Sequence, residues 1–245
     1  MDLLFELFSN LPRQGPGDNE STRKAYSFLK ELPPKPTILD IGCGSGMQTL
    51  ELAIISDGKV IAIDIHQPFL EELSQKAKNL NLLDKIEPLN LSMFDLEFEE
   101  NSFDVIWSEG ALYIYGLENA LKDWQKFLKN KGYFVFSEVC WFKDEIPQEL
   151  RDFWLKEYPA IKSIEMNLKL IAKNNLNIIA HFKLPESSWW DNLYIPFEKN
   201  IEKKRIKYAD DKTKLEQINE MSIEIDMFRK YSDYYGYSFF ITQKQ

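Results

Sequence analysis

Residues 37–53 read TILDIGCGSGMQTLELA, and this stretch decides the fold class. The apolar segment TILDI fits a buried strand, three glycines follow at alternate positions, and MQTLELA has the apolar spacing of a helix. A glycine-rich turn between a strand and a helix lies at the carboxyl edge of an α/β sheet, where such folds bind ligands. Glycines let a ligand approach the main chain closely, and the free amides of the helix start face the same spot. The stretch therefore predicts a ligand-binding loop.

After this stretch, the spacing of apolar residues alternates between a period of two residues, typical of strands, and a period of 3.6 residues, typical of helices. Strands are expected at 37–41, 59–64, 86–91, 103–107 and 132–137, and helices at 46–55, 67–79 and 117–128. Strands and helices that alternate at this pitch form a mostly parallel sheet with helices on both faces. We therefore expect a doubly wound α/β fold.

The two ends of the chain are less regular. Residues 1–36 predict an N-terminal helical cap, with Ser21 or Thr22 capping its second helix. One or two helices fit 147–173, and 177–185 reads as a strand. Residues 186–234 form a polar, aromatic insertion or lid with a long helix over 212–232, and the chain closes on a strand within YYGYSFFITQK (234–244). We expect a single domain over 1–245, with residues 37–140 as the cofactor-binding core.

Composition narrows the classes of partner. The 245 residues contain 30 Lys and Arg against 39 Asp and Glu, a net charge of -9. So acidic a chain is a poor partner for nucleic acid or an anionic membrane, which favours a small molecule. Two cysteines make no disulfide framework, and no apolar stretch approaches the roughly 20 residues that span a bilayer. We therefore expect a cytoplasmic protein that binds no membrane, and two histidines without a ligand pattern predict no metal site.

The spacing of the glycines distinguishes between the classes of ligand that such a loop can bind. A dinucleotide motif G-x-G-x-x-G would place its third glycine on Met47 or Thr49, and no lysine follows Gly46 as a P-loop requires. Asp40, two residues before the first glycine, would repel a pyrophosphate and attract an ammonium group. Asp64 ends the second expected strand, where a carboxylate can accept hydrogen bonds from ribose hydroxyls. These features favour a cationic amino-acid nucleoside.

The glycine stretch resembles the motif [V/I]LD[I/V]GCG[T/S]G of class I S-adenosylmethionine-dependent methyltransferases. The resemblance extends to LSMFDLEFEENSFDVIWSEGALYIYG (91–116) and FLKNKGYFVFSE (127–138). Within the family, the chain is most similar to the small-molecule enzymes of the ubiquinone/menaquinone-biosynthesis type. The resemblance implies a Rossmann-like sheet of seven strands with the last one antiparallel, and S-adenosyl-L-methionine as the cofactor.

The resemblance also implies site residues, position by position. The methionine part of the cofactor would lie beside the loop residues Asp40, Gly42, Cys43, Gly44 and Gly46. Asp64 would hold the ribose and Ile65 would flank the adenine. Relatives often have Gly-Asp where this chain has Leu91-Ser92, so Ser92 and the Met93 amide and side chain would cover the ring instead. The sulfonium would lie near Ser108, Glu109 and Gly110, under a lid formed by Arg13, Gln14, Pro16 and Gly17.

Methyl transfer from a sulfonium is an in-line displacement, so the protein mainly aligns the acceptor and excludes water. A base is needed only where the acceptor must lose a proton, and Glu109 and Glu138 are the carboxylates that follow strands at the right edge. We do not expect His66 or His181 to act as a base. Aromatic residues that could hold a ring or a cationic amine are Tyr113, Tyr115 and Trp141.

Other functions remain open at this point. The same fold could methylate RNA or protein, although WSEGALY stands where an (N/D)PP(Y/F) motif would favour amino-group methylation. A nicotinamide-dependent oxidoreductase is disfavoured by the glycine register and by the lack of a Tyr-x-x-x-Lys pair. A non-catalytic module that senses the cofactor is the last alternative. A homodimer through the N-terminal helices or the insertion is a further expectation.

Overall fold

A single sheet organises the chain, and the computed structural model describes residues 3–245. The strand order is β3-β2-β1-β4-β5-β8-β7. The first five strands are β1 (Thr37–Ile41), β2 (Lys59–Asp64), β3 (Ile86–Asn90), β4 (Phe103–Glu109) and β5 (Leu128–Trp141), all parallel. The last strands are β7 (Leu176–Lys183) and β8 (Tyr235–Lys244), with β8 antiparallel to both of its neighbours. The predicted doubly wound sheet with an antiparallel last strand is confirmed.

An eighth strand was not predicted. Strand β6 (Lys162–Ser163) pairs in parallel with the end of β5. A strand of two residues is too short to show an alternating apolar pattern in the sequence, so only its pairing with β5 identifies it.

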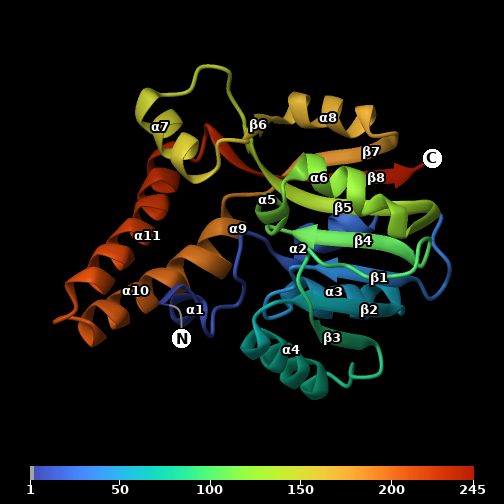
Figure 1. The fold of residues 1–245 in the computed structure, drawn as a ribbon, viewed down its shortest axis with the longest axis horizontal. Coiled ribbons are helices and arrows are strands. Elements are labelled where there is room, and N and C mark those ends of the chain that lie inside the picture. The colour runs from blue at the N-terminus through green and yellow to red at the C-terminus, as the bar shows by residue number, and fades with distance from the viewer. Residues whose placement is uncertain (1–2) are drawn as a thin grey trace.

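The helices cover both faces of the sheet because side chains alternate along each strand. Ile38 packs with Leu52 of α3 (Met47–Ser56) and Leu73 of α4 (Gln67–Asn79). Its neighbour Leu39 packs on the opposite face with Leu121 of α6 (Leu117–Asp123). That second face is also covered by α8 (Ile164–Lys173), seen in front of the sheet with α6 (Figure 1).

Two predicted helix boundaries differ from those in the structure. The helix expected at 117–128 ends at Asp123, and a 3-10 turn, η1 (Gln125–Phe127), follows it, because Leu128 already pairs with Phe103 in the sheet. Helix α2 (Asn19–Tyr26) is capped by Asp18, whose side chain accepts a hydrogen bond from the Ser21 amide, so the cap lies before the predicted Ser21 or Thr22.

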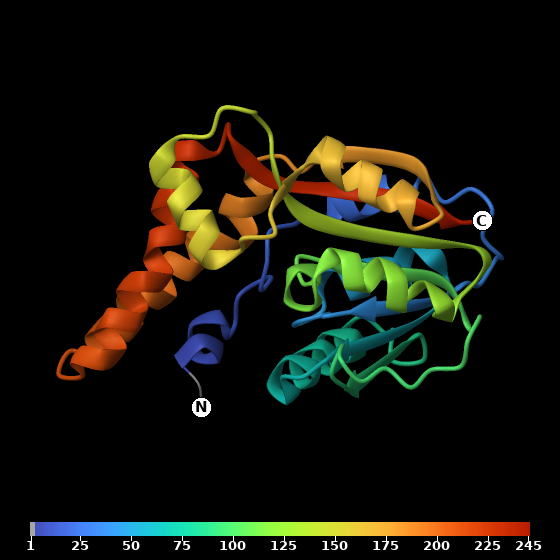
Figure 2. The same ribbon diagram turned by 45° about the horizontal axis from the view of Figure 1, so that its top comes forward.

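The remaining helices form a lobe at one end of the sheet (Figures 1 and 2). It contains α1 (Leu3–Phe8), α7 (Gln148–Glu157) and, within the predicted insertion, α9 (Ser187–Trp189), the π-helix η2 (Trp190–Tyr194), α10 (Ile195–Lys207) and α11 (Lys212–Tyr231). Glu6 of α1 pairs with Lys204 and Lys207 of α10, which ties these helices together. From residue 3 to residue 245, the helices are all too short or too polar to cross a bilayer.

Strand β1 pairs with β2 on one side and with β4 on the other. The strand order therefore reverses between β1 and β4. In open α/β sheets, such a switch point opens a crevice beyond the carboxyl ends of the strands. The helical lobe stands at this end of the sheet, where the short helix α5 (Leu112–Tyr115) follows β4 (Figure 1).

Candidate functional site

The crevice at the switch point is a cavity of about 740 Å³. Its floor comes from the ends of β1, β2 and β4, and its roof comes from α1, the segment that follows it, α7, α10 and α11. Cavities of a few hundred to a thousand Å³ are typical of small-molecule and cofactor sites. The cavity therefore lies beside the glycine stretch.

The glycine loop turns sharply between β1 and α3. Gly42, Gly44 and Gly46 have φ angles of 74°, 54° and 84°, in the left-handed region that favours glycine. The Gly42 and Cys43 amides donate hydrogen bonds to the Ile63 carbonyl at 2.9 and 3.0 Å, which fixes the loop against β2. Gly42, Cys43 and Gly44 line the cavity, whereas Gly46 packs under Leu73 of α4.

Asp64 lies beside this loop at the end of β2. One carboxylate oxygen accepts a hydrogen bond from the Gly44 amide at 2.9 Å, and the other accepts from the His66 amide at 2.9 Å. Each oxygen keeps a free lone pair, and the residue lines the cavity. The carboxylate can therefore accept hydrogen bonds from a vicinal diol.

The wall next to Asp64 is mostly apolar. Ile65 is 64% exposed, and its apolar neighbours on the wall include Phe69, Leu91, Met93 and Phe94. Ser92 also lines this wall, and its hydroxyl accepts a hydrogen bond from the Phe94 amide at 3.2 Å. A flat, uncharged ring system suits such a surface.

Asp40 lies beneath the loop and does not face the ligand. Its side chain is fully buried, accepts a hydrogen bond from the Thr49 hydroxyl at 2.6 Å and is absent from the cavity wall. Burial raises the pKa of this carboxyl to about 7, although the hydrogen bond from Thr49 opposes the rise. The expectation that Asp40 attracts an ammonium group at the loop mouth therefore differs from the structure, because the β1 register turns the carboxylate into the protein.

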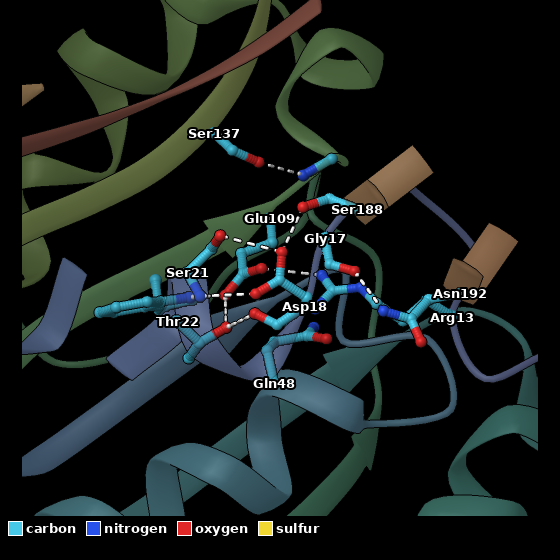
Figure 3. Close-up of polar contacts among 12 residues, drawn as sticks. Arg13, Gly17, Asp18, Ser21, Thr22, Gln48, Glu109, Ser137, Ser188 and Asn192 are labelled. Carbon is cyan, nitrogen blue, oxygen red and sulfur yellow. Dashed lines mark hydrogen bonds and ion pairs between the residues drawn. The ribbon is translucent and has the colours of Figure 1, made fainter. Parts of the chain in front are cut away.

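Arg13 and Glu109, which both line the cavity, form a buried ion pair (Figure 3). Arg13 is 3% exposed, and its Nη2 donates to Glu109 Oε2 at 2.8 Å. Glu109 Oε1 accepts two further hydrogen bonds, from the Thr22 hydroxyl and from the Trp107 indole, both at 2.8 Å. Three donors therefore hold the Glu109 carboxylate in place.

The second guanidinium nitrogen of Arg13 has no such partner. Arg13 Nη1 is buried without a hydrogen bond from any residue between 3 and 245. An unpaired buried donor is costly, so a ligand acceptor is expected at this position. Gly17 packs directly on the guanidinium, where a Cβ would lie 2.5 Å from Cζ, but Gly17 does not line the cavity.

The segment that carries Arg13 is fastened to both the loop and the insertion. Gln14 Oε1 accepts a hydrogen bond from the Ser45 amide at 2.7 Å and lies over Gly44. Asn192 of the insertion donates to the Gly17 carbonyl at 2.9 Å, and the Ser188 hydroxyl donates to Asp18 (Figure 3). These contacts hold the N-terminal segment between the glycine loop and the insertion.

The structure separates the other predicted residues. Tyr113 lines the cavity, whereas Tyr115 donates to Asp123 at 2.7 Å and Trp141 packs among aromatic side chains, both away from the wall. Ser108 is buried and its hydroxyl donates to the Ile41 carbonyl at 3.0 Å, which joins β4 to β1. Ser108 therefore supports the floor of the cavity.

Glu138 is 2% exposed and lies outside the cavity. Burial raises the pKa of its carboxyl to about 7, against the opposing effect of a hydrogen bond from the Tyr158 hydroxyl. Tyr158 itself lines a smaller, second cavity, so Glu138 reaches that space only through this tyrosine.

Sequence reasoning missed the contribution of α1. Leu4, Phe5 and Phe8 line the cavity, and the Phe5 ring stacks on His66 with 3.8 Å between centroids. It also missed Glu224 of α11, which lines the cavity although it lies far along the chain from the glycine stretch. No local pattern marks these residues, because only the docking of the helical lobe brings them to the site.

These features fit an amino-acid nucleoside. Gly42 and Gly44 leave backbone exposed at the cavity wall, Asp64 can accept from a ribose, and Arg13 Nη1 can bind a carboxylate. Across residues 3–245, no three His, Cys, Asp or Glu side chains gather as a metal site would require.

Comparison with known proteins agrees with this geometry. Residues 38–132 match a family of methyltransferase domains. The chain is 31% identical over 134 residues to the ubiquinone/menaquinone biosynthesis C-methyltransferase of Rickettsia prowazekii, covering 52% of this chain and 53% of that protein. It is 29% identical over 102 residues to the sterol 24-C-methyltransferase of Saccharomyces cerevisiae, covering 41% and 27%. The chain thus spans about half the length, or less, of these curated relatives.

Solved structures share the fold over the whole chain. A methyltransferase from Geobacter sulfurreducens, in complex with S-adenosyl-L-homocysteine, has a TM-score of 0.85 at 16% identity and covers 100% of this chain and 98% of its own. One from Thiobacillus denitrificans, with the same ligand, has a TM-score of 0.86 at 17% identity and covers 100% and 99%. Residues 38–132 are therefore similar to methyltransferase domains, and the solved structures show that the chain shares their fold.

Proposed function

We propose that this protein transfers the methyl group of S-adenosylmethionine to a nitrogen or oxygen atom of a small molecule. The proposal rests on a single cavity that contains three features. Asp64 can accept hydrogen bonds from a diol, the glycine loop exposes its backbone, and Arg13 has a nitrogen without a hydrogen-bond partner among residues 3–245. A second cavity of about 200 Å³ adjoins it and would receive the acceptor. So small a space favours a small molecule over RNA or a folded protein.

Each part of the cofactor has a counterpart in the cavity. The ribose hydroxyls would donate to Asp64, and the adenine would lie on the apolar wall beside Ile65 and Met93. The methionine carboxylate would bind Arg13 Nη1, while the Arg13 Nη2 contact with Glu109 holds the guanidinium in position. We propose that Glu109 positions Arg13 rather than serving as a base, because its oxygens already accept three hydrogen bonds.

The bound cofactor supplies a methyl group on a sulfonium, already activated for displacement. The protein therefore has to orient the acceptor in line with the methyl carbon and keep water away. Helices α1, α10 and α11 would exclude water, since their side chains roof the cavity. A base is required only if the acceptor atom carries a proton that it must lose.

Calorimetric titration tests cofactor binding directly. We expect S-adenosyl-L-homocysteine to bind and NAD not to bind, and the reverse result would refute the proposal. Asp64→Ala should weaken binding by about 1–3 kcal/mol through the unpaired ribose hydroxyls. Asp84→Ala, an exposed position outside the cavity, is the matched control.

The atom that is methylated can be assigned by spectroscopy. The two similar proteins described above are C-methyltransferases, whereas we expect N- or O-methylation here. A cofactor labelled with ¹³C in its methyl group gives products whose methyl shifts separate carbon, oxygen and nitrogen. A product methyl bonded to carbon would contradict this part of the proposal. We also expect a cytoplasmic enzyme, and the elution volume on gel filtration would test for a homodimer.

A further inference from the structure

The second cavity adjoins the cofactor cavity, and the two share lining residues from the N-terminal segment, the end of β4, α5, α7, α10 and α11. Gly15 and Gly110 line both cavities, and a Cβ added to Gly15 would lie 3.7 Å from the Gly110 carbonyl oxygen. Gly110 directly follows β4, beside the glycine loop. A molecule in the second cavity, which we call the acceptor chamber, can therefore reach the cofactor.

Aromatic side chains dominate the walls of the acceptor chamber. They come from several different elements and include Tyr113, Trp154, Tyr158, Trp189, Tyr194 and Tyr237. The faces of such rings attract a cation, most strongly where water is excluded. The Trp154 indole nitrogen is also buried without a partner among residues 3–245, which leaves a donor for a polar ligand.

The charges around the acceptor chamber are negative. Glu157 and Glu224 line it, and none of its lining residues within 3–245 is a lysine, arginine or histidine. On the side of the larger cavity, Asp64, Glu109 and Glu220 add carboxylates, and the cations are Lys156 and Arg13, which pairs with Glu109. Lys156 lies 3.4 Å from Glu157, so Glu224 has no cationic partner of its own in the chamber.

Glu224 is held in the chamber by one hydrogen bond. The Tyr194 hydroxyl donates to its Oε1 at 2.7 Å. Burial raises the pKa of Glu224 above its ordinary value; the Tyr194 hydrogen bond opposes this effect and the charge of Glu157 adds to it. A carboxylate in such surroundings is a stronger proton acceptor than one in water.

We propose that the acceptor chamber binds a compact alkyl amine as its ammonium ion against Glu224 and the surrounding rings, and that Glu224 takes one proton from it. The inference deepens the proposed function and rests on it. An alkyl amine is protonated at neutral pH, as a lysine is, and an ammonium nitrogen has no lone pair with which to attack.

The proposed step balances. Glu224 accepts one proton from the ammonium ion, giving a neutral amine and a protonated carboxyl group. The nitrogen lone pair then forms the bond to the methyl carbon, and the pair from the broken carbon–sulfur bond stays on sulfur. The product is a methylammonium ion, and the proton on Glu224 returns to solvent when the products leave.

Three probes of similar shape and different charge test the chamber in the wild-type protein saturated with S-adenosyl-L-homocysteine. They are 2-phenylethylamine, 2-phenylethanol and 3-phenylpropionate, and tryptophan fluorescence can follow them because Trp154 and Trp189 line the chamber. We expect the amine to bind at least tenfold more tightly than the alcohol, and the carboxylate to bind most weakly. Equal or tighter binding of the alcohol or the carboxylate would overturn the proposal.

A charge-removing variant assigns the effect to one residue. Glu224→Gln should weaken binding of 2-phenylethylamine about tenfold and leave binding of 2-phenylethanol unchanged. Glu216→Gln, at an exposed position on the same helix outside both cavities, should change neither. Unchanged amine binding in Glu224→Gln would refute the role of this residue.

The proposed methyltransferase activity and the proposed amine site in the acceptor chamber can be refuted separately. If wild-type protein does not bind S-adenosyl-L-homocysteine, the proposed methyltransferase activity is wrong. If it binds that ligand but shows no preference for the amine probe, only the inference about the acceptor chamber is overturned.

Discussion

Replacing Glu138 by glutamine should change how the stability of the protein depends on pH. Glu138 lies on β5 with 2% of its surface exposed, and its Oε2 has no partner among residues 3–245. Burial is the main cause that raises the pKa of its carboxyl from 4.5 to about 7. The folded protein therefore binds a proton on Glu138 more tightly than the unfolded chain does.

The sign and size of the effect follow from this difference. Because the folded pKa is the higher one, the contribution of Glu138 to stability is complete below pH 4.5 and is lost as the pH rises through about 7. At about 1.36 kcal/mol for each pKa unit, the full loss is about 3 kcal/mol. A glutamine is neutral throughout, so Glu138→Gln should not show this loss.

The assay is urea unfolding at pH 5 and pH 8.5. The stability of Glu138→Gln relative to wild type should rise by about 2–3 kcal/mol between these two conditions. Comparing the variant with wild type removes the pH dependence of all other groups, including that of buried Asp40. Glu145→Gln, at an exposed position between β5 and α7, serves as the control. A difference that stays constant from pH 5 to pH 8.5 would refute the reasoning.

Three further variants test other parts of the structure. Arg13→Leu leaves Glu109 as an unpaired buried charge and should destabilise the protein by about 3–5 kcal/mol in urea unfolding, and a loss below 1 kcal/mol would contradict a buried pair. Gly46→Ala places a side chain at a φ of 84° and against Leu73, so thermal unfolding should show a loss of at least about 1–2 kcal/mol; an unchanged Tm would argue against this loop geometry. Glu6 has a pKa lowered to about 2 by hydrogen bonds from its lysine and tyrosine partners, so its stabilisation is present above pH 4.5 and lost towards pH 2. Glu6→Gln should therefore be less stable than wild type at pH 7 and approach it near pH 3 in urea unfolding, and an equal difference at both pH values would contradict this.

The Arg13–Glu109 pair also relates the helical lobe to the core. Glu109 ends β4, and Thr22 belongs to α2, so one carboxylate connects the sheet to the N-terminal cap. Asp18, in the same segment, accepts from Ser188 of the insertion. These contacts therefore set the position of the N-terminal segment (Figure 3).

The sequence by itself determined the core of the fold and the place of the cavity in which we propose that the cofactor binds. Strands such as TILDI and KVIAID, which are β1 and β2, are visible because buried parallel strands are continuous apolar runs. The glycine register and Asp64 lie next to these strands, so their position at the carboxyl edge followed directly. These features depend on neighbours within a few residues along the chain, and local patterns are what a sequence displays.

Only the tertiary structure decided which way the side chains face and what completes the site. Asp40 and Asp64 look equivalent in the sequence, but the twofold alternation along a strand and the turn of the loop bury the first and expose the second to the cavity. Glu109 became a partner of Arg13 across 96 positions, and Glu224 reached the acceptor chamber from α11. Such contacts arise from the packing of distant elements, and no spacing along the chain encodes them.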